Sequence, residues 1–135
     1  MRAVIDTNAL LSAERRQLLF FAAINAYELV LSDYIIAERR ETMAELRWNP
    51  RAAQGLIDDV TRLARMVDHR EITGGNYDRW LFDRDDFPIM ATALAGGAEY
   101  IVTWNTRDFP PKRRFAGVTI TTPDAFIRLL TQPRP

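Results

Sequence analysis

The sequence predicts an α/β fold of three layers, α/β/α, in which helices cover both faces of a central parallel sheet. Two observations indicate this class. Short apolar runs that suit buried strands alternate along the chain with segments whose apolar residues recur at helical spacing. Residues 83–110 also hold an acidic cluster, an apolar helix and a buried strand in direct succession. Helices that alternate with strands in this way connect parallel strands and bury both faces of the sheet.

Length and composition bound the possible functions. The 135 residues are enough for one domain with a core of its own, and we expect residues 1–135 to form it without a linker or a repeat. The formal net charge is zero, so bulk charge gives no argument for a nucleic-acid or membrane partner. The chain has no cysteine and a single histidine, His69, which excludes thiolate metal sites and sites built from several histidines.

The sequence also carries no sign of export or of membrane insertion. No apolar run is long enough to span a bilayer, and the first residues enter a strand at once instead of forming a leader. We therefore expect a cytoplasmic protein without a membrane partner.

The first half of the chain alternates between strand and helix. Residues 2–5 suit a short buried strand, and residues 9–25 suit a helix with an apolar side. Residues 29–31 suit a second strand, after which Ser32 is placed to cap a helix over residues 33–47. The apolar stripe of that helix consists of Ile35, Ile36, Met43 and Leu46.

The middle of the chain is predicted with less detail. Arg39 falls inside the apolar stripe, where it either stretches its stem along the core or pairs with an acid. Pro50 opens another helix, which runs to about Met66 and packs antiparallel to the helix before it. Residues 67–72 suit a brief strand, and residues 77–82 show no pattern that assigns them.

The apolar helix within residues 83–110 runs from Ile89 to Ala95. Pro88 suits its first turn, because the amide that proline lacks would be unpaired there. Asp85 or Asp86 then lies at the helix N-terminus, where the partial positive charge of the unpaired amides favours a carboxylate. A buried strand at Tyr100–Val102 follows.

The last elements are a basic loop, a strand and a helix. Residues 110–114 form a rigid loop rich in proline and basic side chains, and residues 118–120 suit a short strand. Thr122 caps a final helix that has Pro123 in its first turn.

Four acids fall at junctions that face the carboxyl edge of the predicted sheet, where open α/β folds bind ligands. Asp6 follows the first strand, and Glu38 lies in the second turn of the helix after the second strand. Asp86 opens the helix before the strand Tyr100–Val102, and Asp108 lies in the turn after it.

Carboxylates gathered at one edge repel one another and raise each other's pKa. Hard divalent cations with oxygen ligands offset this repulsion, so we expect Mg²⁺ or Mn²⁺ at this edge. Two ions about 3.5–4 Å apart would clamp the attacking and leaving oxygens of a phosphodiester. A site with one ion is the alternative.

Three blocks of this sequence resemble the PIN domain family, in particular the small prokaryotic PIN proteins that include VapC-type toxins. The blocks are Val4-Ile5-Asp6-Thr7-Asn8-Ala9-Leu10, the helix opening from Ser32 to Glu38, and the stretch from Asp83 to Pro110. They span nearly the whole chain, and the third is the most specific. The resemblance implies a PIN fold and a metal-dependent endoribonuclease, with Asp6, Glu38 and Asp86 as its main acids.

The resemblance also implies a set of supporting residues. Thr7, Asn8 and Thr103 would make hydrogen bonds that support the acids. Some PIN proteins place a fourth acid at the position of Asn105, and others place it at the position of Asp108. We favour Asp108 as the fourth catalytic and metal-binding acid, because the amide oxygen of Asn105 binds metal only weakly.

Basic residues near this fourth position are candidates to contact the RNA backbone. They are Arg107, Lys112, Arg113 and Arg114. The resemblance implies three partners, namely an RNA substrate, a small antitoxin protein and a second copy of the chain in a homodimer. Two alternatives stay open: a PIN-like module that binds RNA or protein without cutting, and a nuclease of housekeeping RNA processing.

Overall fold

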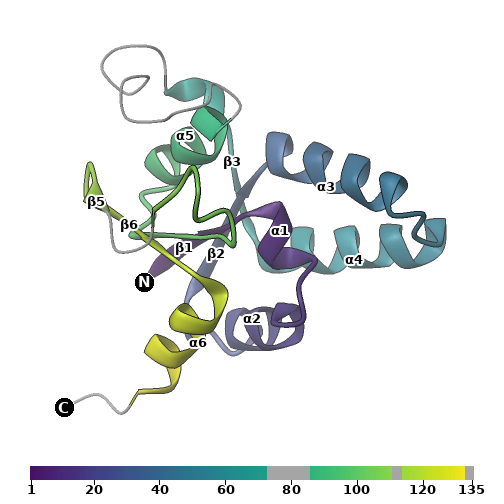
Figure 1. The fold of residues 1–135 in the computed structure, drawn as a ribbon, viewed down its shortest axis with the longest axis horizontal. Coiled ribbons are helices and arrows are strands. Elements are labelled where there is room, and N and C mark those ends of the chain that lie inside the picture. The colour runs from purple at the N-terminus through teal and green to yellow at the C-terminus, as the bar shows by residue number, and fades with distance from the viewer. Residues whose placement is uncertain (73–85, 111–113, 133–135) are drawn as a thin grey trace.

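The computed structural model describes residues 1–72, 86–110 and 114–132, and Figure 1 shows the arrangement of their elements. In chain order these are β1 (Arg2–Ile5), α1 (Thr7–Leu10), α2 (Arg15–Ala23), β2 (Glu28–Ser32), α3 (Asp33–Glu45), α4 (Pro50–Leu63), β3 (Arg65–Val67), the 3-10 helix η1 (His69–Glu71), α5 (Phe87–Ala95), β4 (Tyr100–Val102), β5 (Arg114–Phe115), β6 (Val118–Thr121) and α6 (Pro123–Thr131).

One sheet joins the strands in the described part of the chain, in the order β3-β2-β1-β4-β6-β5. Neighbouring strands are parallel from β3 through β2, β1 and β4 to β6. At the edge, β5 pairs antiparallel with β6. Val4 in β1 lies between Val30 of β2 and Ile101 of β4. The parallel sheet confirms the α/β fold that the sequence predicts.

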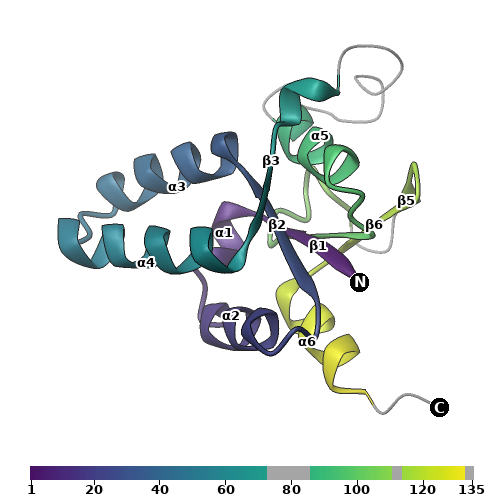
Figure 2. The same cartoon turned by 180° about the vertical axis from the view of Figure 1, so that it is seen from behind.

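Helices lie on both sides of this sheet. Helix α5 packs on β1, β2 and β4, and α2 and α6 lie together on the opposite side (Figures 1 and 2). Helices α3 and α4 form an antiparallel pair that extends away from the sheet (Figures 1 and 2), as the sequence predicts. Among the described residues, no helix combines the length and the apolar character needed to cross a membrane.

The central strands and α5 supply much of the core. Ala3, Val4 and Ile5 of β1 are fully buried, and so is the face of α5 that packs on the sheet. Gly96 ends α5 so close to β2 that a Cβ atom there would lie 2.5 Å from Cγ1 of Val30. A larger residue at this position would force the helix away from the strand.

Arg39 is buried in this core, and within the described ranges it forms no ion pair with an acid. Its side chain has no exposed surface, and none of its three guanidinium nitrogens has a hydrogen-bond partner among the described residues. Burial, and then the charge of Arg15, lowers the pKa of Arg39 to about 10. Of the two interpretations that the sequence left open, the structure therefore favours the stem stretched along the core.

The structure corrects three helix boundaries. The helix expected over residues 9–25 is two helices, because α1 ends at Leu10 and α2 begins only at Arg15. Leu46 was expected in the apolar stripe of α3, but it lies just past the last helical residue and is exposed. The helix expected to reach Met66 ends at Leu63.

The strand expected over residues 67–72 is also corrected. The strand β3 begins earlier, at Arg65, because its backbone pairs with β2 up to Val67. The chain then turns into η1, where Oδ1 of Asp68 accepts a hydrogen bond from the backbone N–H of Arg70. His69, the single histidine, lies in this turn.

Candidate active site

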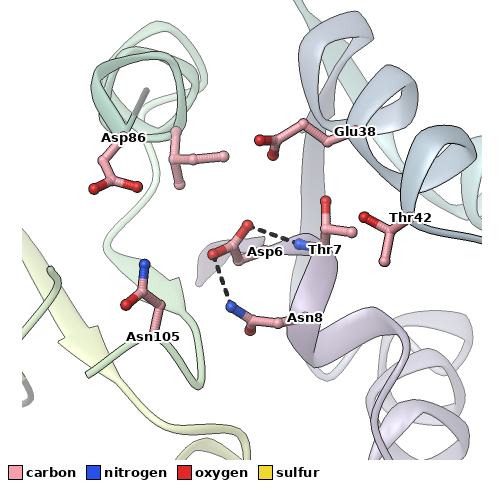
Figure 3. Close-up of a pocket in the computed structure, with 8 residues that line it drawn as sticks. Asp6, Thr7, Asn8, Glu38, Thr42, Asp86 and Asn105 are labelled. Atoms are coloured by element: carbon pink, nitrogen blue, oxygen red, sulfur yellow. Dashed lines mark hydrogen bonds between the residues drawn. The ribbon is translucent and has the colours of Figure 1, made fainter. Parts of the chain in front are cut away.

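A pocket of about 230 Å³ opens between the start of α1, the helix α3, the N-terminus of α5 and the turn after β4. It is lined by Asp6, Thr7, Asn8, Glu38, Thr42, Asp86, Ile89 and Asn105. The carboxylates of Asp6, Glu38 and Asp86 point into its shared space from three sides (Figure 3). The fold therefore brings together three acids that lie far apart in the sequence.

Asp6 is the most buried of these acids. Its carboxylate accepts hydrogen bonds from the backbone N–H of Thr7 at 2.7 Å, from Oγ1 of Thr103 at 2.9 Å and from Nδ2 of Asn8 at 3.3 Å. Burial raises the pKa of Asp6 above its ordinary value, while these hydrogen bonds oppose the rise. A cation in the pocket would favour the ionised carboxylate further.

A small polar network joins the turns that follow β1 and β4. Oγ1 of Thr103 accepts a hydrogen bond from the backbone N–H of Asn105 at 3.0 Å. Oδ1 of Asn8 accepts one from the backbone N–H of Trp104 at 2.9 Å. Thr103 and Asn8 thus hold the turn after β4 against the start of α1, as supporting residues would.

Glu38 reaches the pocket from the second turn of α3. It lies three residues after the buried Ile35 and is itself half-buried, so its carboxylate can face the sheet edge. Oη of Tyr34, one turn earlier on the helix, donates a hydrogen bond to Oε1 of Glu38 at 3.1 Å. Thr42 follows Glu38 by one turn and lines the same pocket.

Asp86 occupies the N-cap position of α5, and Pro88 lies in the first turn as the sequence predicts. Its carboxylate makes no capping hydrogen bond to the α5 backbone. The carboxylate lines the pocket instead (Figure 3). The buried Ile89 of the same helix is also part of the lining. The N-terminus of α5 adds partial positive charge near this carboxylate.

Asn105 and Asp108 are the two candidates for the fourth residue of the site. Asn105 lines the pocket, whereas Asp108 is absent from its lining. Oδ2 of Asp108 accepts a hydrogen bond from Nδ2 of Asn105 at 3.1 Å. Asp108, which the sequence favoured as the fourth ligand, is thus bonded to Asn105 and does not itself line this pocket.

The oxygen donors of this pocket suit a hard divalent cation. Within residues 1–72, 86–110 and 114–132, no group of three or more histidine, cysteine or acidic side chains forms a preassembled metal cage. Mg²⁺ needs no such cage, since proteins usually bind it through one or two carboxylates, with water and substrate oxygens completing the shell. The donors present therefore fit Mg²⁺ or Mn²⁺.

Two residues of the pocket lining were not predicted from the sequence. Thr42 and Ile89 were not singled out, although Thr42 follows Glu38 at the spacing of one helical turn, which places both on one face.

Of the basic residues predicted to contact RNA, Arg107 is exposed in the turn after β4, and Arg114 begins β5. Other expected residues lie outside the described part of the chain, namely the unassigned residues 77–82 and Asp83, Asp85, Lys112 and Arg113.

A family model described as PIN domain matches residues 2–107. The chain belongs to the PIN domain family. Every residue that lines the pocket falls inside the matched range, whereas Asp108 lies one residue beyond it. PIN domains are generally nucleases that use divalent metal ions.

Solved structures show the same fold. This PIN domain is similar to a chain in the crystal structure of VapBC2 from Rickettsia felis bound to a DNA fragment from their promoter. The two chains share 17% sequence identity with a TM-score of 0.58, and the likeness covers 90% of this chain and 98% of that chain. No curated protein sequence matches the chain.

Proposed function

We propose that this PIN domain is an endoribonuclease that cleaves RNA phosphodiester bonds with Mg²⁺ or Mn²⁺. The observation that carries this proposal is the convergence of Asp6, Glu38 and Asp86 on one pocket, from three separate elements of the fold (Figure 3). Three carboxylates in one small pocket favour a cation, and phosphodiester hydrolysis is the chemistry that such a cation serves in nucleases.

The three acids would take two roles in the proposed reaction. Asp6 and Asp86 would hold the ion, and the donors around Asp6 fix the orientation of its carboxylate. When bound, the ion acts as a Lewis acid and lowers the pKa of a coordinated water. Glu38 faces this space and would accept a proton from the attacking water. The P–O3′ bond would break as the new P–O bond forms, and O3′ would take a proton from solvent water, which leaves a 5′-phosphate and a 3′-hydroxyl.

Supporting residues would position the substrate. Asn105, oriented by Asp108, presents its side chain to the pocket and is placed to contact a phosphate oxygen. Arg107 is exposed in the same turn and, with Lys112, Arg113 and Arg114, is the proposed contact to the RNA backbone.

The biological role that we propose is that of the toxin in a toxin–antitoxin pair. The support is the fold-level likeness to a chain of VapBC2, whose crystal structure also contains a DNA fragment from their promoter. By this analogy the protein would form a homodimer, act in the cytoplasm and bind a small antitoxin protein. Growth arrest on induction, relieved by co-expression of the neighbouring small gene, is the expected result, and unimpaired growth would contradict it.

A cleavage assay tests the proposed activity. Purified protein is incubated with end-labelled structured RNAs in Mn²⁺, in Mg²⁺ and in a chelator. We expect cleavage only with a metal, and a loss of about 100-fold or more in Asp86→Asn. Asp58→Asn, which removes an exposed acid of α4, is the matched control and should cleave as the wild type does.

Two results would overturn the nuclease assignment. One is full cleavage by Asp86→Asn. The other is a wild-type protein that binds these RNAs but leaves them intact with every metal, as a module without nuclease activity would. Unchanged circular dichroism spectra must accompany either result, so that misfolding does not account for it.

A further inference from the structure

A second pocket, of about 290 Å³, lies where the start of α3 meets the end of β3 and η1. Its lining residues are Asp33, Tyr34, Val67, Asp68, His69 and Arg70. The proposed reaction uses none of them directly. Its volume is close to the lower limit of about 300 Å³ for small-molecule sites, which suits a group of the size of one nucleobase.

Tyr34 connects this second pocket with the candidate active site. Its ring lines the second pocket, while its hydroxyl donates to Oε1 of Glu38 at 3.1 Å in the first. An RNA strand with its scissile phosphate near Glu38 would therefore bring a neighbouring nucleotide to Tyr34. This adjacency distinguishes the second pocket from a depression elsewhere on the surface.

Two aromatic side chains in contact with each other, Tyr34 and His69, line the second pocket. The rings of Tyr34 and His69 have centroids 5.6 Å apart and are tilted by 55°. Both side chains are half-buried, so each is fixed by packing and still presents part of its surface. Proteins bind the splayed bases of single-stranded RNA by stacking them on aromatic rings of this kind.

The second pocket is also lined by a cation, Arg70, and by acids. Asp68 accepts hydrogen bonds from Nε of Arg70 at 2.9 Å and from Nη2 at 3.1 Å, which holds the guanidinium plane in place. The exposed Asp33 lines the same pocket, where its negative charge acts on Arg70. Because Asp33 is exposed in the lining, its carboxylate can accept hydrogen bonds from a ligand that brings N–H donors.

We propose that this second pocket receives a nucleobase of the RNA next to the scissile phosphate, with guanine preferred. The proposal rests on the proposed nuclease function. The base would stack on Tyr34 and His69, and the fixed guanidinium of Arg70 would face its sugar–phosphate. Guanine is preferred because its N1–H and N2–H can both donate to the carboxylate of Asp33, whereas uracil presents one N–H between two carbonyl oxygens.

Nucleotide binding to the metal-free protein tests this assignment without requiring cleavage. Protein labelled with ¹⁵N is titrated in a chelator with GMP, AMP, CMP and UMP, and amide shifts are followed by NMR. We expect GMP to shift the amides of Tyr34, Val67 and His69, and to bind about tenfold more tightly than UMP.

Three variants separate the parts of the proposed site. His69→Ala should weaken GMP binding by about tenfold through lost stacking. Asp33→Asn should remove the preference for GMP over UMP. Tyr34→Phe keeps the ring and loses the hydroxyl, so it should bind GMP as the wild type does while cleaving RNA more slowly. Phe20→Ala, which removes an exposed ring of α2, is the matched control and should leave GMP binding unchanged.

The outcomes distinguish a failure of this proposal from a failure of the nuclease function. If the wild type cleaves RNA but no nucleotide shifts these amides, the second pocket is not a base site. Equal affinity for all four nucleotides, or GMP binding that is insensitive to Asp33→Asn, overturns the guanine assignment. GMP binding at these amides in a protein that never cleaves RNA upholds the second pocket and overturns the nuclease function alone.

Discussion

Oγ1 of Thr103 donates a hydrogen bond to Oδ2 of Asp6 over 2.9 Å, although 97 residues separate them in sequence. The parallel pairing of β1 with β4, in register at Ile5 and Val102, places the residues that follow these two strands side by side. The most buried acid of the pocket is therefore held by the sheet itself. The carboxylate of Asp6 is positioned before any ligand arrives.

This hydrogen bond should contribute measurably to stability. Thr103→Val keeps the shape of the side chain but removes the donor to Asp6 and the acceptor for the backbone of Asn105. We expect a loss of about 1–3 kcal/mol in the free energy of unfolding, measured by urea denaturation. Thr103→Ser retains the hydroxyl and should lose less than Thr103→Val. Equal stability of Thr103→Val and the wild type would show that the bond has no net effect.

The raised pKa of Asp6 predicts how stability changes with pH. The folded state binds this proton more tightly than the unfolded chain, whose carboxyl has the ordinary value of 3.8. The contribution of Asp6 to folding stability is thus complete below the unfolded-state pKa of 3.8. This contribution is lost as the pH rises through the raised pKa of Asp6 in the folded state. In metal-free solution, Asp6→Asn should therefore gain stability relative to the wild type as the pH increases over this window. Parallel pH profiles for the two proteins would contradict the assignment.

Arg39 predicts an unusual gain in stability. Its guanidinium is fully buried, and no hydrogen bond to it arises from the described residues. Arg39→Met removes the buried charge and keeps an unbranched stem, so the free energy of unfolding should rise by about 1–4 kcal/mol. Arg40→Met, at the exposed neighbouring position, should change it by less than about 0.5 kcal/mol. A large loss in Arg39→Met would reveal a buried partner for this charge.

Asn105 and Asp108 should differ in their effect on metal binding. Asn105→Asp places a fourth carboxylate in the pocket lining and should tighten Mn²⁺ binding in calorimetry. Asp108→Asn keeps the shape of the side chain that orients Asn105, so we expect it to weaken Mn²⁺ binding only slightly. If Asp108→Asn abolished binding while Asn105→Ala did not, Asp108 would be the ligand that the sequence favoured.

Much of the fold was predictable because its signals are local. The apolar run at residues 2–5 and the strand Tyr100–Val102 have the length and composition of buried parallel strands, and Pro88 marks the start of α5. Acids that directly follow or precede such elements must lie near the carboxyl edge of the sheet. This rule alone predicted that Asp6 and Asp86 lie at the same edge of the sheet.

What could not be predicted depends on contacts between distant segments. The strand β3 includes residues that the sequence assigned to the end of a helix. It forms because pairing with β2 satisfies the backbone hydrogen bonds of these residues. The relation between Asn105 and Asp108 is set by the shape of one turn, which composition does not reveal. The place of Arg39 in the apolar stripe pointed to its burial, but arginine usually lies at the surface, and helical spacing alone does not say whether a buried guanidinium meets an acid.

Diffraction from crystals soaked in Mn²⁺ tests most directly whether Asp6, Glu38 and Asp86 form a metal site. We predict an anomalous peak in the pocket, within coordination distance of the carboxylates of Asp6 and Asp86, that disappears in crystals of Asp86→Asn. An ordered pocket that stays without a peak at saturating Mn²⁺, or a peak that remains unchanged in Asp86→Asn, would contradict a metal site built on these acids.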